Sequence, residues 1–280
     1  MDTVADTLRF AARTLAASSE SPELDAEVLL STVMGVARSA LIVRAEEPVA
    51  VELLRAYQGL IDRRVSGVPV AYLTGRREFW SMPLKVTPAV LVPRHETELL
   101  VEMALKVIPK AEVRSVLDLG TGSGAVALAI ASERPLARVT GADVSPAALG
   151  VARDNARSLA LPNVAWRLGS WFDAVPGERF DAIVANPPYV AAGDPALAAL
   201  EAEPEIALVS GPAGLDALTA IIEGAAPHLE SGGWLVLEHG STQQGRVASL
   251  LERRGFCGVE THEDFSGRPR VTLGNFQSSH

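Results

Sequence analysis

The chain has 280 residues, enough for one large α/β domain or for two smaller domains. Hydrophobic residues make up 48% of it and charged residues 21%, which is typical of a globular protein and excludes a disordered chain. The single cysteine, Cys257, excludes an internal disulfide framework and a cysteine-rich zinc site. No apolar run reaches the roughly 18 residues of a membrane-spanning helix, and the acidic first residues lack a secretory signal. We therefore expect a cytoplasmic protein without a membrane partner.

The net charge of −9 is unevenly distributed along the chain. Residues 1–75 carry 7 basic and 10 acidic side chains, residues 76–110 carry 6 and 4, and residues 111–280 carry 12 and 20. Proteins that work on duplex nucleic acid usually present a basic footprint. The acidic C-terminal segment argues against such a partner, so we expect no stable complex with nucleic acid.

The first 75 residues are predicted to form a small helical bundle. Apolar side chains recur at helical spacing over 4–15, 22–33 and 49–65, and Pro22 suits the first turn of the second helix. Residues 76–110 change character. Glu78-Phe79-Trp80 and Leu84-Lys85-Val86 flank a turn and predict a hairpin, and 96–107 predicts a helix that links two domains.

From residue 111 to residue 280, short apolar runs alternate with helical segments. This alternation predicts an α/β fold with a doubly wound, Rossmann-like parallel sheet. A helix is expected over 215–229, and a long loop, or a loop with a short helix, over 191–204. The predicted strands are 113–119, 137–142, 163–168, 180–185, 234–238, 258–262 and 270–273.

A glycine-rich turn, Asp118-Leu119-Gly120-Thr121-Gly122-Ser123-Gly124, joins the first of these strands to the next helix. Glycines allow a ligand to approach the main chain, and a helix N-terminus offers free N–H groups. The pattern is G-x-G-x-G. It lacks the spacing of the dinucleotide fingerprint and the lysine of the phosphate loop. We interpret the turn as a cofactor site without phosphate-reading features, formed by Gly120, Thr121, Gly122, Ser123 and Gly124.

Asp143 lies 25 residues after Asp118, at the end of the second predicted strand. In this architecture an acidic residue about 20 residues beyond the turn hydrogen-bonds a ribose diol. The turn and Asp143 together predict a ribose-bearing ligand without a pyrophosphate, and S-adenosyl-L-methionine fits that description. The alternative is that Asp143 and Ser145 only begin the next helix.

The segment Asn186-Pro187-Pro188-Tyr189 follows the predicted strand 180–185, and ligands bind at the carboxyl ends of such strands. The two prolines stiffen the turn and remove two N–H donors. The Asn186 side-chain oxygen and the Pro187 carbonyl can each accept one hydrogen of a planar NH₂ group, which Tyr189 can cover. The alternative is a simple turn that ends the strand.

An amide or exocyclic amine nitrogen is a poor nucleophile because its lone pair is delocalised. Two acceptors that hold both hydrogens turn the lone pair toward a methyl sulfonium, so acceleration comes from orientation and electrostatics. We therefore predict Asn186, Pro187, Pro188 and Tyr189 as the catalytic segment of a methyltransferase.

These two motifs resemble those of class I S-adenosylmethionine-dependent methyltransferases that modify planar nitrogens. Within that class, the chain resembles the HemK/PrmC family, the release factor glutamine methyltransferases, from about residue 5 to residue 275. Further segments resemble that family: Ala71-Tyr72-Leu73-Thr74-Gly75, Glu78-Phe79-Trp80, Leu91-Val92-Pro93-Arg94 with Glu96-Thr97-Glu98, Leu237-Glu238-His239-Gly240 and Arg270-Val271-Thr272-Leu273-Gly274.

The resemblance implies N5-methylation of the glutamine in the Gly-Gly-Gln motif of peptide chain release factors, supporting translation termination. It implies that Gly120 to Gly124 and Asp143 bind the cofactor, that Trp171 lies by its adenine, and that Asn186 contacts both cofactor and substrate. Pro187 to Tyr189 would complete the glutamine pocket. It further implies that the N-terminal helices dock the release factor. We expect the enzyme to be a monomer.

The chain departs from the family pattern at three positions. Ser170 replaces an acidic residue before Trp171, His95 replaces the second proline of a Pro-Arg-Pro run, and Ala202 replaces the phenylalanine of a Phe-Glu-Pro run.

Two other functions fit parts of the pattern. An adenine-specific DNA methyltransferase could use the same tetrapeptide after flipping the base, and a ribosome-associated binding protein could retain the fold alone. The five histidines show no zinc-ligand spacing, so we expect no metal. We expect structural roles for Glu238 and His239, and a buried, inert Cys257.

Overall fold

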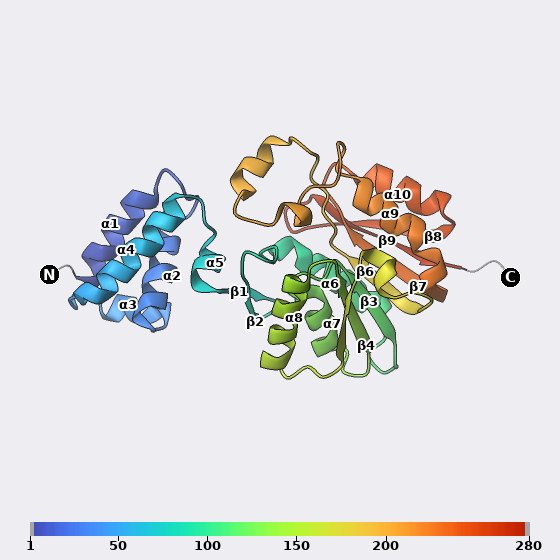
Figure 1. The fold of residues 1–280 in the computed structure, drawn as a ribbon, viewed down its shortest axis with the longest axis horizontal. Coiled ribbons are helices and arrows are strands. Elements are labelled where there is room, and N and C mark those ends of the chain that lie inside the picture. The colour runs from blue at the N-terminus through green and yellow to red at the C-terminus, as the bar shows by residue number, and fades with distance from the viewer. Residues whose placement is uncertain (1–2, 278–280) are drawn as a thin grey trace. The chain divides into compact units, whose positions relative to one another are not determined.

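The computed structural model describes residues 3–277 and divides into two compact units, Met1–Arg76 and Arg77–His280 (Figure 1). The units are described separately. Within the described residues, no helix is long and apolar enough to cross a membrane.

The N-terminal unit consists of helices around one small core. Tyr57 is buried there, and its hydroxyl donates to the Ala26 carbonyl at 3.0 Å, so the phenol does not leave an unpaired donor in the core. Gly35 ends the second helix at a φ of 64°, a left-handed conformation that favours glycine. The helices are α1 (Val4–Leu15), α2 (Pro22–Met34), α3 (Arg38–Val43), α4 (Val51–Val65) and α5 (Val70–Thr74).

A two-stranded hairpin follows, formed by β1 (Arg76–Phe79) and β2 (Met82–Lys85). Trp80 and Ser81 at its tip both have positive φ, which matches the twist of a tight two-residue turn. The chain then passes through the 3₁₀ helix η1 (His95–Thr97) into α6 (Glu98–Val107).

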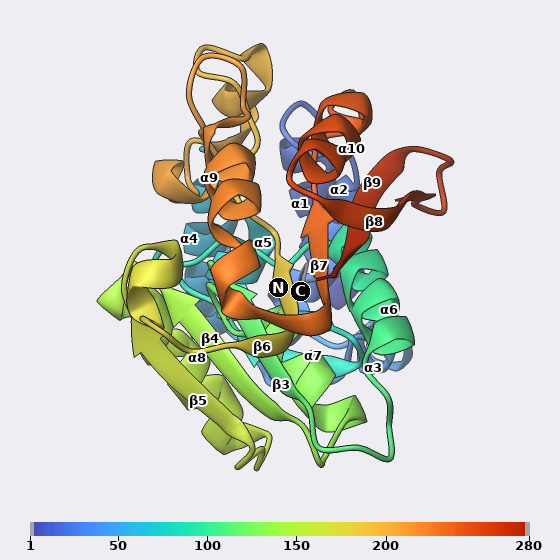
Figure 2. The same ribbon diagram turned by 90° about the vertical axis from the view of Figure 1, so that its right-hand side faces the viewer.

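The second unit contains a seven-stranded sheet in the order β5-β4-β3-β6-β7-β9-β8, and Figure 2 shows the strands from β5 to β7 side by side. The α/β, doubly wound fold class is confirmed. One strand departs from the predicted parallel pattern. β9 runs antiparallel to both of its neighbours, β7 and β8, because a short connection joins β8 to β9. The strands are β3 (Ser115–Leu119), β4 (Arg138–Asp143), β5 (Val164–Leu168), β6 (Phe180–Ala185), β7 (Leu229–Glu238), β8 (Phe256–Glu263) and β9 (Pro269–Phe276).

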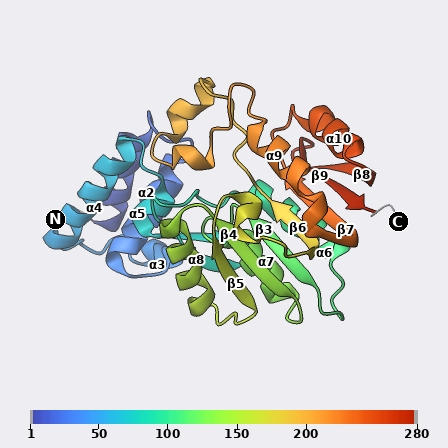
Figure 3. The ribbon, with the colours of Figure 1, turned by 45° about the vertical axis from the view of Figure 1, so that its right-hand side comes forward.

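Helices cover both faces of the sheet. Side chains alternate along each strand, so Val116 of β3 joins the core under α6, α7 (Ala125–Glu133) and α8 (Pro146–Ser158). Its neighbour Leu117 joins the opposite core, with α9 (Asp216–Gly224) and α10 (Gln244–Arg253). Figure 3 shows α9 and α10 on the side of the sheet away from α7 and α8. Buried apolar layers therefore pack on both faces of the sheet and hold the carboxyl ends of its strands in place.

The segment 191–204, predicted as a long loop or a loop with a short helix, contains the 3₁₀ helix η3 (Pro195–Leu200), so the second alternative is confirmed. Glu203 anchors its end: the buried carboxylate accepts from the Val92 N–H at 3.0 Å and pairs with Arg94. Three further 3₁₀ helices complete the unit: η2 (Trp171–Ala174), η4 (Glu205–Ala207) and η5 (Ala226–His228).

Cys257 is exposed, so the prediction that it is buried is wrong. The alternation of side chains along β8 explains this. Phe256 points into the core, and the next side chain therefore turns outward.

Candidate active site

A cavity of about 750 Å³ lies at the carboxyl ends of the parallel strands. β4 and β6 lie on opposite sides of β3, so the chain order reverses there, and ligands bind at such a switch point in open α/β sheets. The lining includes Gly120 and Gly122 after β3, Asp143 at the end of β4, and Asn186 and Pro188 after β6. Residues distant in sequence are therefore gathered around one hollow.

The glycine turn requires its glycines for conformational reasons. Gly120, Gly122 and Gly124 have φ values of 71°, 55° and 84°, all in the left-handed region. A Cβ on Gly124 would also lie 2.9 Å from the Trp166 ring. The Gly120 N–H donates to the Ala142 carbonyl at 2.9 Å and fastens the turn to the neighbouring strand.

The other turn residues hold this shape and do not belong to the cavity lining. The Thr121 hydroxyl donates to Asp118 Oδ2 at 2.6 Å, and the Ala127 N–H of α7 donates to the same oxygen at 3.2 Å. Ser123 is buried, and its carbonyl accepts from the Asn155 side chain at 2.9 Å. The buried Asp118 carboxyl thus links the strand, the turn and the following helix.

Asp143 is held in one orientation by two backbone N–H donors. Gly122 donates to Oδ2 at 2.9 Å and Ser145 donates to Oδ1 at 2.8 Å. Each carboxylate oxygen keeps a further lone pair, so the group can accept two more hydrogen bonds from the cavity. Ser145 also caps α8, because its hydroxyl accepts from the Ala148 N–H. This segment therefore does begin a helix, as the alternative interpretation stated, and it lies beside the cavity as well.

The charged residues in the lining are Asp143 and Asp216, both acidic. Asp216 begins α9 and was not predicted, since no motif marks an isolated aspartate in a helical segment. Two carboxylates without a basic partner in the lining disfavour an anion and favour a cation. The hollow therefore suits a ligand with a positive charge and no phosphate.

Trp171 lines the cavity beside the glycine turn. Its φ of 45° is unusual for a residue with a side chain, and a Cβ built on Gly120 would lie 3.5 Å from the indole ring. The indole thus supplies a flat apolar wall next to the turn. Val144, which follows Asp143, lines the same hollow and is half exposed.

Asn186 is fixed through its amide nitrogen. Nδ2 donates to the Thr97 hydroxyl at 3.0 Å, while Oδ1 has no hydrogen-bond partner within the described part of the chain. Pro187 is buried beneath it, and Pro188 lines the cavity. The side-chain oxygen is therefore free to accept a hydrogen bond from a ligand.

Tyr189 is tied at both its ends and does not belong to the cavity lining. Its hydroxyl donates to Glu238 Oε1 at 3.3 Å, and its carbonyl accepts from the Gln243 side chain at 3.0 Å. The first and last residues of the tetrapeptide are thus anchored by contacts from η1, β7 and Gln243, just before α10.

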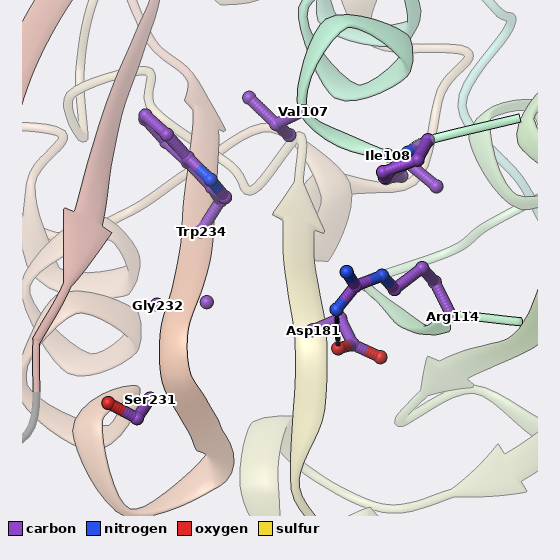
Figure 4. A pocket seen from close by; sticks show the side chains of 9 residues that line it. Val107, Ile108, Arg114, Asp181, Ser231, Gly232 and Trp234 are labelled. Atoms are coloured by element: carbon purple, nitrogen blue, oxygen red, sulfur yellow. Dashed lines mark hydrogen bonds and ion pairs between the residues drawn. The ribbon is translucent and has the colours of Figure 1, made fainter. Parts of the chain in front are cut away.

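A second, much smaller cavity of about 120 Å³ lies at the opposite end of the sheet (Figure 4). Arg114 and Asp181 face it and form an ion pair at 2.7 Å, beside Trp234. Because Glu112 also pairs with Arg114, the charge there is already compensated. The large cavity at the carboxyl ends is therefore the candidate active site.

Two buried carboxyl groups near the large cavity hold protons unusually tightly. Burial raises the pKa of Glu238 from its ordinary value of 4.5 to about 7, and burial raises the pKa of Asp118 from 3.8 to about 7. Hydrogen bonds from Tyr189 and Thr121 oppose these shifts without cancelling them.

The pKa of Glu238 predicts how stability changes with pH. Between about pH 4.5 and 7 the folded state retains a proton that the unfolded state has released, so the free energy of unfolding falls as pH rises. We expect Glu238→Gln to reduce that slope by up to about 1.4 kcal/mol per pH unit. Urea unfolding at several pH values, followed by tryptophan fluorescence, measures it, because all four tryptophans lie after residue 76. Equal slopes in both proteins would contradict the assignment.

Comparison with known proteins decides the family. A family model described as PrmC N-terminal domain matches residues 6–75, and one described as methyltransferase small domain matches residues 95–203. A protein of Xylella fastidiosa (strain Temecula1), named release factor glutamine methyltransferase, is 49% identical over 93% of this chain and 96% of its own length. The chain belongs to the release factor glutamine methyltransferase family. The resemblance drawn from the motifs is therefore confirmed.

Other members of the release factor glutamine methyltransferase family are almost as similar. The Escherichia coli (strain K12) protein of that name is 44% identical over 92% of this chain and 94% of its own. Among solved structures, a T. thermophilus 16S rRNA N2 G1207 methyltransferase in complex with AdoMet and guanosine has a TM-score of 0.57. It is 23% identical and covers 72% of this chain and 50% of its own. A Pyrococcus furiosus methyltransferase has a TM-score of 0.54 at 21% identity, covering 71% and 90%. At these identities the two structures support the fold alone.

Proposed function

We propose that this methyltransferase transfers a methyl group from S-adenosyl-L-methionine to the side-chain amide nitrogen, N5, of the glutamine in the Gly-Gly-Gln motif of peptide chain release factors. The observation that carries the proposal is the free Oδ1 of Asn186 at the edge of a cavity whose charged lining is acidic. The names of the close relatives support the choice of substrate.

The lining fits this cofactor. Asp143 retains lone pairs for the ribose hydroxyls, and Trp171 offers its ring to the adenine. Gly120 and Gly122 line the cavity without side chains and allow close approach of the methionine moiety. Asp143 and Asp216 favour the positive charges of the sulfonium and the amino group. When bound, the cofactor supplies an electrophilic methyl group on a sulfonium.

The residues of the protein prepare the amide. Asn186 Oδ1 and the Pro187 carbonyl accept its two hydrogens, which turns the nitrogen lone pair out of conjugation and toward the methyl donor. Pro188 forms part of the wall of the glutamine pocket. Tyr189, outside the lining, holds the end of the tetrapeptide through Glu238 and Gln243. After transfer the methylated nitrogen carries an extra proton and is strongly acidic. It releases that proton to water, so no strong base is needed at the site.

We further propose three functional segments: residues 1–75 dock the release factor, 76–110 form the hairpin and linker helix, and 111–280 form the cofactor-dependent methyltransferase domain. Exposed apolar side chains in the first segment support this proposal. Phe10, Ile42 and Val43 are 64%, 79% and 87% exposed, which suits a protein partner. The enzyme is expected to act as a monomer in the cytoplasm.

The DNA alternative has less support. A flipped adenine brings flanking phosphates to the mouth of the site, and a DNA enzyme neutralises them with lysine and arginine. The cavity lining contains two aspartates and no basic residue.

Mass spectrometry of a release factor incubated with the full-length enzyme tests the proposal. We expect a gain of one methyl group, mapped to the Gly-Gly-Gln glutamine, that requires S-adenosyl-L-methionine. A release factor with alanine in place of that glutamine is the control and should gain nothing. No methylation of the release factor by an enzyme that binds the cofactor in calorimetry would contradict the proposed substrate. Methylation of an added DNA duplex instead would favour the alternative.

Tyr189→Phe should have a modest effect on this reaction. Phenylalanine keeps the ring and loses the hydrogen bond to Glu238, so we expect a loss of roughly five- to tenfold in turnover, the equivalent of about one neutral hydrogen bond. Single-turnover methylation compared with the wild type measures it. A loss as large as that of Asn186→Ala would mean that the hydroxyl contacts the substrate.

A further inference from the structure

Thr97 is a buried residue that contacts the tetrapeptide from a different part of the chain. It ends η1, just before α6, and only 4% of it is exposed. Its hydroxyl accepts the Asn186 Nδ2–H at 3.0 Å, across 89 residues of sequence. A threonine hydroxyl has a single proton, so the proton not used toward Asn186 needs an acceptor elsewhere.

Glu238, at the end of β7, supplies that acceptor. The carboxyl group is 1% exposed. Its Oε1 accepts the Tyr189 hydroxyl at 3.3 Å, and its Oε2 is buried and has no hydrogen-bond partner among the described residues. The Thr97 hydroxyl lies close enough to lower the pKa of this carboxyl, so the unpartnered Oε2 is the acceptor available to the Thr97 proton. One buried acceptor is thus shared by the tyrosine at the end of the tetrapeptide and by the threonine that holds its asparagine.

We propose that Thr97 is a positioning residue for methyl transfer: with Glu238 behind it, it fixes which side of the Asn186 amide faces the active site. This inference rests on the proposed function, since it names the group that orients the substrate-binding oxygen. A free asparagine side chain presents its oxygen or its NH₂ group with little preference. The donors arranged from Asn186 through Thr97 to Glu238 remove that freedom. Because Asn186 Nδ2 donates to Thr97, the Oδ1 atom on the other side of the amide must face the active site.

Orientation matters because the substrate also presents N–H donors. If the Asn186 amide turned over, two NH₂ groups would face each other and the glutamine would be displaced. A small misplacement at a reacting centre can reduce turnover about a hundredfold. The cofactor, which by this proposal is held mainly by the glycine turn and Asp143, should bind as before.

Thr97→Val tests the proposal, since valine has nearly the same shape and no hydroxyl. We expect kcat for release factor methylation to fall roughly 10- to 100-fold, with cofactor affinity changed less than about threefold. Thr97→Ser restores the hydroxyl and should recover most of the loss. Thr261→Val is the matched control, because Thr261 is partly buried on the edge strand β8, outside the cavity lining, and its hydroxyl also pairs with another side chain, that of Thr272, at 2.8 Å.

A second measurement does not depend on methylation. In ¹⁵N-labelled protein, the side-chain NH₂ signal of Asn186, assigned as the signal missing from Asn186→Ala, should exchange with water at least about tenfold faster in Thr97→Val. It should be unchanged in Thr261→Val. A threonine that only fills space would leave this exchange rate unaltered.

The two measurements separate the possible failures. Unchanged exchange in Thr97→Val, with or without a loss of kcat, overturns the positioning role. An unchanged kcat in Thr97→Val also overturns it and leaves the proposed function standing. If the wild type itself does not methylate release factor, the proposed function fails, and accelerated exchange in the variant still supports the orientation of Asn186 by Thr97.

Discussion

Asn186→Ala should reduce methylation of the release factor by about a thousandfold. The variant loses the side-chain oxygen that we expect to hold one amide hydrogen, and removing one preorganised hydrogen-bonding group at a reacting centre costs about 10²- to 10³-fold in turnover. The affinity for S-adenosyl-L-methionine should stay within about tenfold, because the other proposed cofactor contacts remain. Single-turnover kinetics and calorimetry on the same preparation measure the two effects.

Asn275→Ala is a suitable control for this variant. Asn275 is also a partly buried asparagine, and its side chain donates to the Gly232 carbonyl at 2.7 Å, at the opposite end of the sheet. It should change stability more than turnover. Near-normal turnover in Asn186→Ala would refute the mechanism. A large loss of cofactor affinity would mean that Asn186 mainly binds the cofactor and not the substrate amide.

Asp143→Ala should weaken cofactor binding by about a hundredfold. The carboxylate holds the Gly122 and Ser145 N–H groups and is expected to hold the ribose hydroxyls as well. Hydrogen bonds to a charged group contribute about 1.5–3 kcal/mol each, and two decades in Kd correspond to about 2.7 kcal/mol. At saturating cofactor, turnover should recover to within about tenfold, because the amide-binding residues remain. Calorimetry and the KM for the cofactor measure the effect.

Asp154→Ala provides the comparison. Asp154 is an acidic residue on α8 whose ion pair with Lys85 lies at the surface, and such pairs contribute little to stability. It removes the same charge without touching the cavity. If the two variants bound the cofactor equally well, Asp143 would be only the helix-start residue considered from the sequence.

Much of the second unit follows from local pattern. The runs over 113–119 and 180–185 contain strands because a buried strand needs an unbroken apolar segment. The predicted and observed bounds of the helices and strands differ by a few residues, because the ends of an element depend on the residues packed around them. The helix expected over 215–229 ends at Gly224, and β7 already begins at Leu229.

The lining of the cavity was only partly predictable. The glycine turn and the tetrapeptide can be recognised in the sequence, because unusual backbone geometry needs glycine or proline at defined positions. Asp216 and Thr97 carry no such mark. Thr97 lies within a segment that resembles the family, yet its contact with Asn186 could not be read from that resemblance.

The sequence by itself determined the fold class, the family and the two motifs at the strand ends, because periodicity, glycine and proline act over a few neighbouring residues. Only the tertiary structure decided which groups surround those motifs. The pairing of Asn186 with Thr97, and of Tyr189 with Glu238 across 49 residues, depends on which strands lie side by side. The antiparallel end of the sheet and the exposure of Cys257 depend on it as well. Sheet order is set by the burial of whole faces, a property that no short stretch of sequence contains.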